Sequence, residues 1–146
     1  QDPTHSKEID VLAWTWGASN SGTTHTGAGG GSGKANVQDL SFTKYIDKSS
    51  PTLLLKAMKG DLISSGLLTI RKAGSKVPLE YIKLELKDIL VTSVSTGGSG
   101  GEDRLAENIT LNFAKYKLTY TPQNQDGSAG PEEVVQWNIA ENNESF

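Results

Sequence analysis

The stretch THTGAGGGSGKANVQ, residues 24–38, holds the residue types most suggestive of chemistry, because dense glycine ending in Gly-Lys is typical of a phosphate-binding loop. The spacing does not fit. Ala35 follows Lys34 where a Walker loop requires Ser or Thr, and Ala28 stands where its first glycine belongs. A dinucleotide fingerprint fails at Ser32, and a strand-like segment follows, so no helix N-terminus would receive phosphate. We therefore predict no nucleotide site.

Other reactive side chains form no catalytic pattern. His5 and His25 have no second His or paired carboxylate at metal-ligand spacing, there is no cysteine, and no serine lies in a nucleophile elbow. We expect no enzymatic activity, no metal and no cofactor. Trp14, Trp16 and Trp137 are compatible with a sugar-stacking platform, but the first two share a strand face with Leu12, which favours core packing.

The charged segment GEDRLAEN, residues 101–108, gathers acidic side chains around one arginine. It is either a solvated loop or an electrostatic contact with another subunit. The acidic residues are Glu102, Asp103 and Glu107, and the candidate contact residues are Glu102, Asp103 and Arg104.

Composition narrows the class of protein. A chain of 146 residues predicts a single domain, 1–146. The net charge of -3 offers no basic surface for nucleic acid, and no apolar run is long enough to enter a membrane. The segment QDPTHSKEID has no apolar core of the kind found in secretory signals, so we expect no signal peptide.

Outside the glycine-rich loops the dominant pattern is strand. Strand signals cover residues 9–17, 37–46, 66–74, 79–95, 107–122 and 134–139. In the two longest segments the apolar phase slips by one residue, which indicates either a β-bulge or a corner. This pattern predicts a mostly antiparallel, closed or nearly closed sheet with one helix.

The helix is expected over residues 47–60. Ser49 or Ser50 suits its N-cap, Pro51 its first turn and Gly60 its left-handed end. At helical spacing on one side lie three apolar residues that we expect to face the core, namely Leu54, Leu55 and Met58.

Several segments have wording unlike generic β sequence, and they follow in order from about Glu8 to Asn138: IDVLAWTWG, GKANVQDLSFTKYIDKSSPTLLL, LTIRKAG, ILVTSVSTGGSGGEDRLAENITLNFAKYKLTYTPQ and VVQWNI. Together they resemble the haemolysin-coregulated protein (Hcp) family, which forms the tube of type VI secretion systems. The resemblance implies a mostly β fold: a β-barrel of two packed antiparallel sheets with one short flanking α-helix and a long glycine-rich hairpin loop. The family normally has a further strand before the polar turn that QDPTHSKEID resembles, so we expect a cropped or truncated N-terminus.

The resemblance also implies a function and partners. Homohexameric rings would stack into a tube, carry effector proteins and a spike protein at the tip, and be driven by a contractile sheath. The tube would assemble in the bacterial cytoplasm and be exported by the system itself. The alternative is a monomeric secreted β-barrel binding module, for example one that binds carbohydrate.

Two sets of residues are candidates for this role. The small polar sides of the first two strands would face the lumen and its cargo, or merely solvent if the chain is a monomer: Ala13, Thr15, Asp39, Ser41 and Thr43. The glycine-rich loop would project from the ring towards a neighbouring subunit or ring, and its candidate residues are Thr26, Gly27, Gly29, Gly30, Gly31, Ser32, Gly33 and Lys34.

Overall fold

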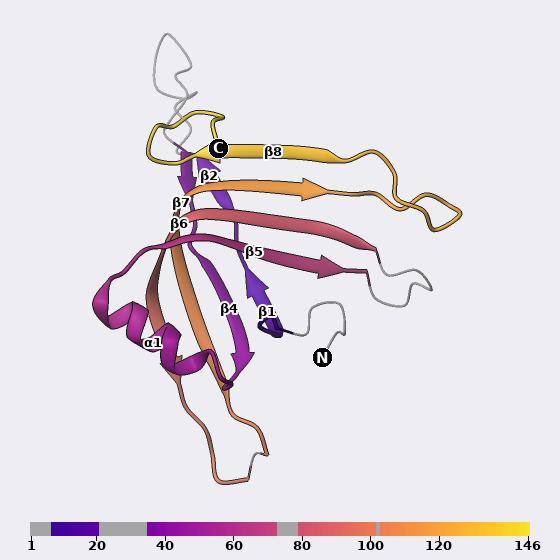
Figure 1. Ribbon diagram of the computed structural model, residues 1–146. Helices are drawn as coiled ribbons and strands as arrows, with labels where there is room; N and C mark the ends of the chain where they lie inside the picture. Colours follow the sequence, from indigo (N-terminus) through magenta and orange to yellow (C-terminus); the bar gives the residue numbers. More distant parts are fainter. Residues whose placement is uncertain (1–6, 21–34, 73–78, 102) are drawn as a thin grey trace. The chain divides into compact units, whose positions relative to one another are not determined.

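The computed structural model describes residues 7–20, 35–72, 79–101 and 103–146 (Figure 1). The chain divides into two compact units. Unit 1 comprises Gln1–Leu62 with Leu90–Asn112, and unit 2 comprises Ile63–Ile89 with Phe113–Phe146. Two long strands, β6 (Glu80–Thr96) and β7 (Ala106–Tyr120), contribute residues to both units. Because these strands are continuous through both, we keep the single domain 1–146 as a prediction.

Unit 1 is built on the strand order β1-β4-β7-β6, in which β1 (Val11–Thr15) and β4 (Leu40–Tyr45) are antiparallel neighbours. A separate antiparallel pair is formed by β2 (Ala18–Asn20) and β3 (Ala35–Val37). The sequence prediction did not include β2, and of β3 it included Val37 alone, because three residues beside a glycine-rich segment are too few to show a two-residue period.

The helix α1 (Ser50–Lys59) follows β4 in unit 1 (Figure 1). Ser49 occupies the predicted N-cap position, although its side chain makes no capping hydrogen bond. The other predicted signals are confirmed: Pro51 lies in the first turn, and Gly60 ends the helix with a φ of 69° while its N–H bonds to the Lys56 carbonyl.

The predicted core-facing stripe of α1 is wrong. Leu54, Leu55 and Met58 are all exposed, and the helix turns Leu53 and Ala57 inward instead. Helical spacing identifies which residues share a face, but the attachment of the helix decides which face turns inward. Apolar residues occur on both sides of α1, so the spacing alone did not determine its rotation.

Unit 2 has the strand order β8-β7-β6-β5, with β5 at Ile63–Arg71 and β8 at Glu133–Asn138. Its buried core includes Leu84 and Leu86 from β6 and an edge-to-face aromatic pair from β7, Phe113 and Tyr116, whose ring centroids are 6.3 Å apart. After β8 the chain turns back, and the Asn138 side chain accepts a hydrogen bond from the Glu141 N–H.

The phase slip in β6 has a specific backbone cause. Asp88 has a φ of 54°, and it lies between Leu86 and Ile89, the buried residues on either side of the slip. The register with β5 stays constant across it, because Ser65 pairs with Lys87 and Ile63 with Ile89. The apolar phase therefore changes at a residue with left-handed backbone conformation, and β6 contains no extra residue relative to β5 at this point. This corrects the β-bulge interpretation for the β5 side of the strand.

The fold class is confirmed: the chain is mostly β, its ladders are antiparallel, and its described residues contain one short helix.

Candidate functional site

The polar strand faces predicted in unit 1 come together on one side of the sheet. Ala13 pairs with Thr43, which pairs with Asn108 of β7, and Thr15 pairs with Ser41, which pairs with Thr110. Directly paired residues in adjacent strands point to the same face. We call this the polar face; it consists of Ala13, Thr15, Asp39, Ser41, Thr43, Asn108, Thr110 and Asn112.

Hydrogen bonds join the side chains of the polar face across the strands. The Thr43 hydroxyl donates to Asn108 Oδ1 at 2.7 Å, and Asn112 Nδ2 donates to Asp39 Oδ1 at 2.9 Å. The hydroxyls of Ser41 and Thr110 lie 3.4 Å apart. These contacts connect short polar side chains of neighbouring strands, so the face is hydrophilic.

The three β7 members of the polar face were missed in the sequence prediction. Asn108, Thr110 and Asn112 alternate with Ile109 and Leu111, so the same two-residue period that identified the β4 residues was present. Only the pairing of β4 with β7 places the two polar rows side by side.

The opposite side of this sheet carries the apolar residues. Trp14 pairs with Phe42, and Phe42 pairs with the fully buried Ile109. The prediction that Trp14 and Trp16 pack in the core is wrong for Trp14 in the single chain, because Trp14 is more than one-third exposed, whereas Trp16 is partly buried. Leu12, which was expected on the same strand face, is half-exposed. Leu12 falls where the register between β1 and β4 shifts, so its backbone has no regular partner.

A buried ion pair lies on the apolar side of unit 1. Lys44 and Glu107 are cross-strand partners with 0% and 1% of their surfaces exposed, and Lys44 Nζ lies 2.5 Å from Glu107 Oε1. The ammonium also contacts Asp47 Oδ1, the Tyr45 carbonyl and Ser50 Oγ, each at 3.0 Å. The Ser50 hydroxyl lies 2.7 Å from Glu107 Oε1. Because Ser50 begins α1, this cluster attaches the start of the helix to β4 and β7.

The position of Glu107 corrects the sequence prediction, which placed it with the charged segment around Arg104. A signal was available: Lys44 is in phase with the apolar Leu40 and Phe42, and Glu107 is in phase with Ile109. Opposite charges at core positions of two strands indicate a buried pair, since neither is stable there alone.

The pKa of the Asp47 carboxyl in this cluster lies below its ordinary value. Partial burial raises the pKa of its carboxyl, but hydrogen bonds from Ser49 and Lys44 outweigh burial and hold the pKa below the ordinary value of 3.8. The carboxylate is therefore ionised at neutral pH and serves as a second counter-ion for Lys44.

The remaining predicted residues lie at or beyond the edges of the described structure. The Arg104 guanidinium stacks 3.8 Å from the centroid of the Tyr45 ring, and Asp103 is exposed. Glu102 and the candidate loop residues 26–34 are outside the described residues, as are His5 and His25. Asn20 pairs with Ala35, which confirms that the glycine-rich segment joins the two strands of a hairpin.

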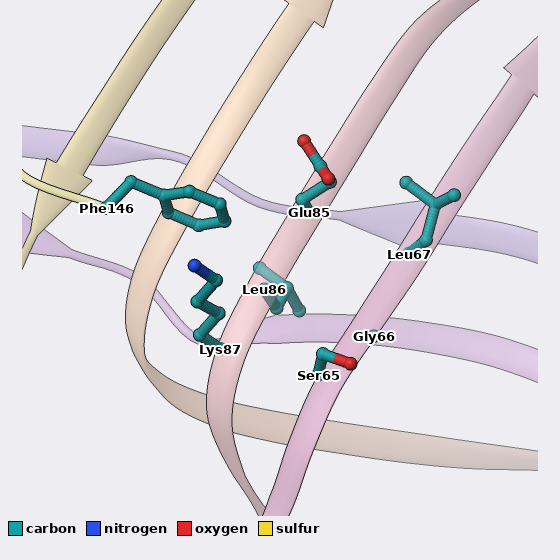
Figure 2. A pocket seen from close by; sticks show the side chains of 7 residues that line it. All are labelled: Ser65, Gly66, Leu67, Glu85, Leu86, Lys87 and Phe146. Carbon is teal, nitrogen blue, oxygen red and sulfur yellow. The ribbon is translucent and has the colours of Figure 1, made fainter.

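Unit 2 contains a shallow pocket of about 360 Å³ (Figure 2). Lys87 points towards Phe146, with its ammonium 3.9 Å from the ring centroid, and Glu85 lies 4.0 Å from Lys117. The pocket's charged groups thus already have partners within the chain. It is lined by Ser65, Gly66, Leu67, Glu85, Leu86, Lys87 and Phe146.

Within the described ranges, His, Asp and Glu side chains form no cluster of three that would hold a metal ion. Among the same residues, no helix has the length and apolarity that crossing a membrane requires.

Comparison with known proteins identifies the family. The profile described as "Type VI secretion system effector, Hcp" matches residues 1–120. Protein hcp1 of Pseudomonas aeruginosa is 58% identical over 144 residues, covering 97% of this chain and 88% of that protein. A solved type six secretion system protein aligns with a TM-score of 0.90 at 30% identity, over 98% of this chain and 90% of the other. Hcp1 from Salmonella typhimurium aligns with a TM-score of 0.78 at 34% identity, over 99% and 89%. The chain therefore belongs to the Hcp family of type VI secretion proteins.

Proposed function

We propose that this chain is a structural subunit of the type VI inner tube, in which hexameric rings stack and carry effector proteins in their lumen. It is assembled in the cytoplasm and exported through the system, with a spike protein at the tube tip and a sheath around it. No bond is made or broken in this role, so the chain acts as a carrier and not as an enzyme.

The observation that carries the proposal is the two-sided sheet of unit 1. One side is the polar face, whose short side chains are bridged to one another by hydrogen bonds. The other side is apolar, and it leaves Leu12 and Trp14 partly exposed in a single chain. A ring subunit needs a smooth hydrophilic surface for a wet lumen and apolar surface to cover against a neighbour.

Assembly is tested by negative-stain electron microscopy together with size-exclusion chromatography and light scattering. We expect annular particles and the mass of a hexamer. A homogeneous monomer over a wide concentration range would contradict ring formation and favour the monomeric binding module, which glycan titration followed by tryptophan fluorescence then tests.

Cargo contact is tested by filling the polar face. Thr15→Arg and Ser41→Arg place bulky charged side chains at two paired positions of the face. We expect them to reduce co-purification of a co-expressed effector of the same secretion system while annular particles persist. Ser65→Arg, at an exposed strand position of unit 2, is the matched control and should retain effector. Unchanged retention in the Thr15 and Ser41 variants would show that the polar face does not contact cargo.

A further inference from the structure

The helix α1 presents its apolar residues to solvent. Leu54 is 47% exposed, Leu55 51% and Met58 76%, and no residue of the ten-residue helix is buried. The residues that turn inward are Leu53, Lys56 and Ala57, which are only partly covered. Leu54, Leu55 and Met58 are spaced i, i+1 and i+4, so they form one continuous stripe on the outer side of the helix. We call these three residues the apolar stripe.

The orientation of the stripe is fixed by the buried cluster at the start of α1. The Ser50 side chain contacts both Lys44 Nζ and Glu107 Oε1, and its oxygen accepts a hydrogen bond from the Asp47 N–H at 3.0 Å. A helix held this way at its first residue cannot rotate to bury another side without losing the Ser50 contacts with Lys44 and Glu107, which would leave buried charged groups with fewer hydrogen-bond partners. The exposed stripe is therefore enforced by the packing of unit 1.

The exposed charged residue of α1 beside the stripe is a lysine, Lys59. The helix SPTLLLKAMK contains no acidic residue, and its other lysine, Lys56, turns inward and is partly covered. The next carboxylate along the chain, that of Asp61, lies beyond the end of the helix and is exposed. The nearest preceding carboxylate, that of Asp47, is engaged by Lys44 and Ser49. Isolated exposed apolar residues are ordinary in proteins, but a continuous stripe beside a cation on a helix is typical of a protein-docking surface.

We propose that the apolar stripe and Lys59 form a docking surface for an acidic amphipathic helix of another protein. The partner would lay apolar residues at i, i+3 and i+4 spacing along Leu54 and Met58, and its carboxylates would meet Lys59. This surface is distinct from the polar face and does not depend on cargo binding.

The charge of α1 distinguishes this partner from two others. A second copy of the chain docking through the same helix would bring lysines of both copies together, which is unfavourable. A membrane surface would require a longer helix with a cationic face, whereas α1 has ten residues and two lysines. An acidic helix complements both the apolar and the charged part of the surface.

Crosslinking in the producing cells tests the proposal on the full chain. A photoreactive benzoylphenylalanine replaces Met58, and the crosslinked peptides are identified by mass spectrometry. We expect a peptide from a different protein, acidic and with apolar residues at helical spacing. The matched control places the same group at Leu67 of unit 2, which is 57% exposed, and should not yield that peptide. Crosslinks to this chain itself, to lipid, or to no partner would each overturn the proposal.

Substitutions then test the chemistry of the contact, using the crosslinked peptide as a synthetic probe in fluorescence anisotropy. Leu54→Ser with Met58→Ser should weaken binding by at least about tenfold, because both apolar contacts are lost. Lys59→Glu should weaken binding about threefold to tenfold and reduce its salt dependence. Leu67→Ser should leave binding unchanged. Equal affinity of the Leu54/Met58 variant would refute the docking surface, whereas the presence or absence of rings in the microscope tests only the tube assignment.

Discussion

Replacing Lys44 by Met should destabilise the chain by about 3–5 kcal/mol, because it leaves a buried carboxylate without its counter-ion. Glu107 is 1% exposed, its Oε1 would keep only the contact with Ser50 Oγ, and its Oε2 has no hydrogen-bond partner among the described residues. The reverse change, Glu107→Leu, should cost less, about 1–3 kcal/mol, since the Lys44 ammonium keeps the Asp47 carboxylate, the Tyr45 carbonyl and Ser50 Oγ at 3.0 Å each.

The double variant Lys44→Met with Glu107→Leu removes both charges and fills the space with apolar atoms. It should lie within about 2 kcal/mol of the original chain, because replacing a whole buried pair is often close to neutral. Its destabilisation should therefore fall at least about 2 kcal/mol short of the sum of the two single variants.

The assay is urea unfolding followed by tryptophan fluorescence and circular dichroism, at one fixed protein concentration so that self-association does not shift the midpoint. The control is Lys83→Met, which removes an exposed lysine 3.5 Å from Glu80 and should change stability by less than about 1 kcal/mol. The reasoning is refuted if Glu107→Leu costs as much as Lys44→Met, or if the two substitutions are additive.

Three further changes test local features of the structure. Asp88→Gly should stabilise the chain by about 0.5–1 kcal/mol and Asp88→Ala should destabilise it, because Asp88 has a φ of 54° and glycine alone adopts that region freely. A lower free energy of unfolding for the glycine variant in urea would contradict this prediction. The pKa of Asp47 is lowered in the folded chain, so its ionised form stabilises the fold above about pH 3.8, and this contribution is lost as pH falls through the folded-state pKa. Asp47→Asn should therefore flatten the fall in unfolding free energy below about pH 4. An unchanged slope of unfolding free energy against pH would refute this role of Asp47. Phe146→Ala should cost about 0.5–1 kcal/mol by removing the ring over Lys87, with Phe146→Leu as the control that retains apolar contact; equal effects of the two would show that the cation contributes nothing.

The sequence by itself determined the class of fold and the family. In a strand, successive side chains point to opposite faces, so the alternation of polar and apolar residues in the sequence predicted a mostly antiparallel β fold. The same alternation correctly assigned Ser41 and Thr43 to one face and Phe42 to the other. The limits of α1 were also local, since Pro51 and Gly60 act through their own backbone conformations. The failed spacing of the glycine-rich segment predicted, without any structure, that the chain has no nucleotide site.

Tertiary structure decided which elements meet and which way they face. Lys44 and Glu107 lie more than sixty residues apart in the chain, about the separation of Thr43 and Asn108, and only the pairing of β4 with β7 makes them partners. That pairing assembles the polar face, and the cluster at Ser50 sets the rotation of α1, so Leu54, Leu55 and Met58 point outward against expectation. Periodicity specifies that two sides of an element differ, but the side that is buried depends on partners distant in the sequence.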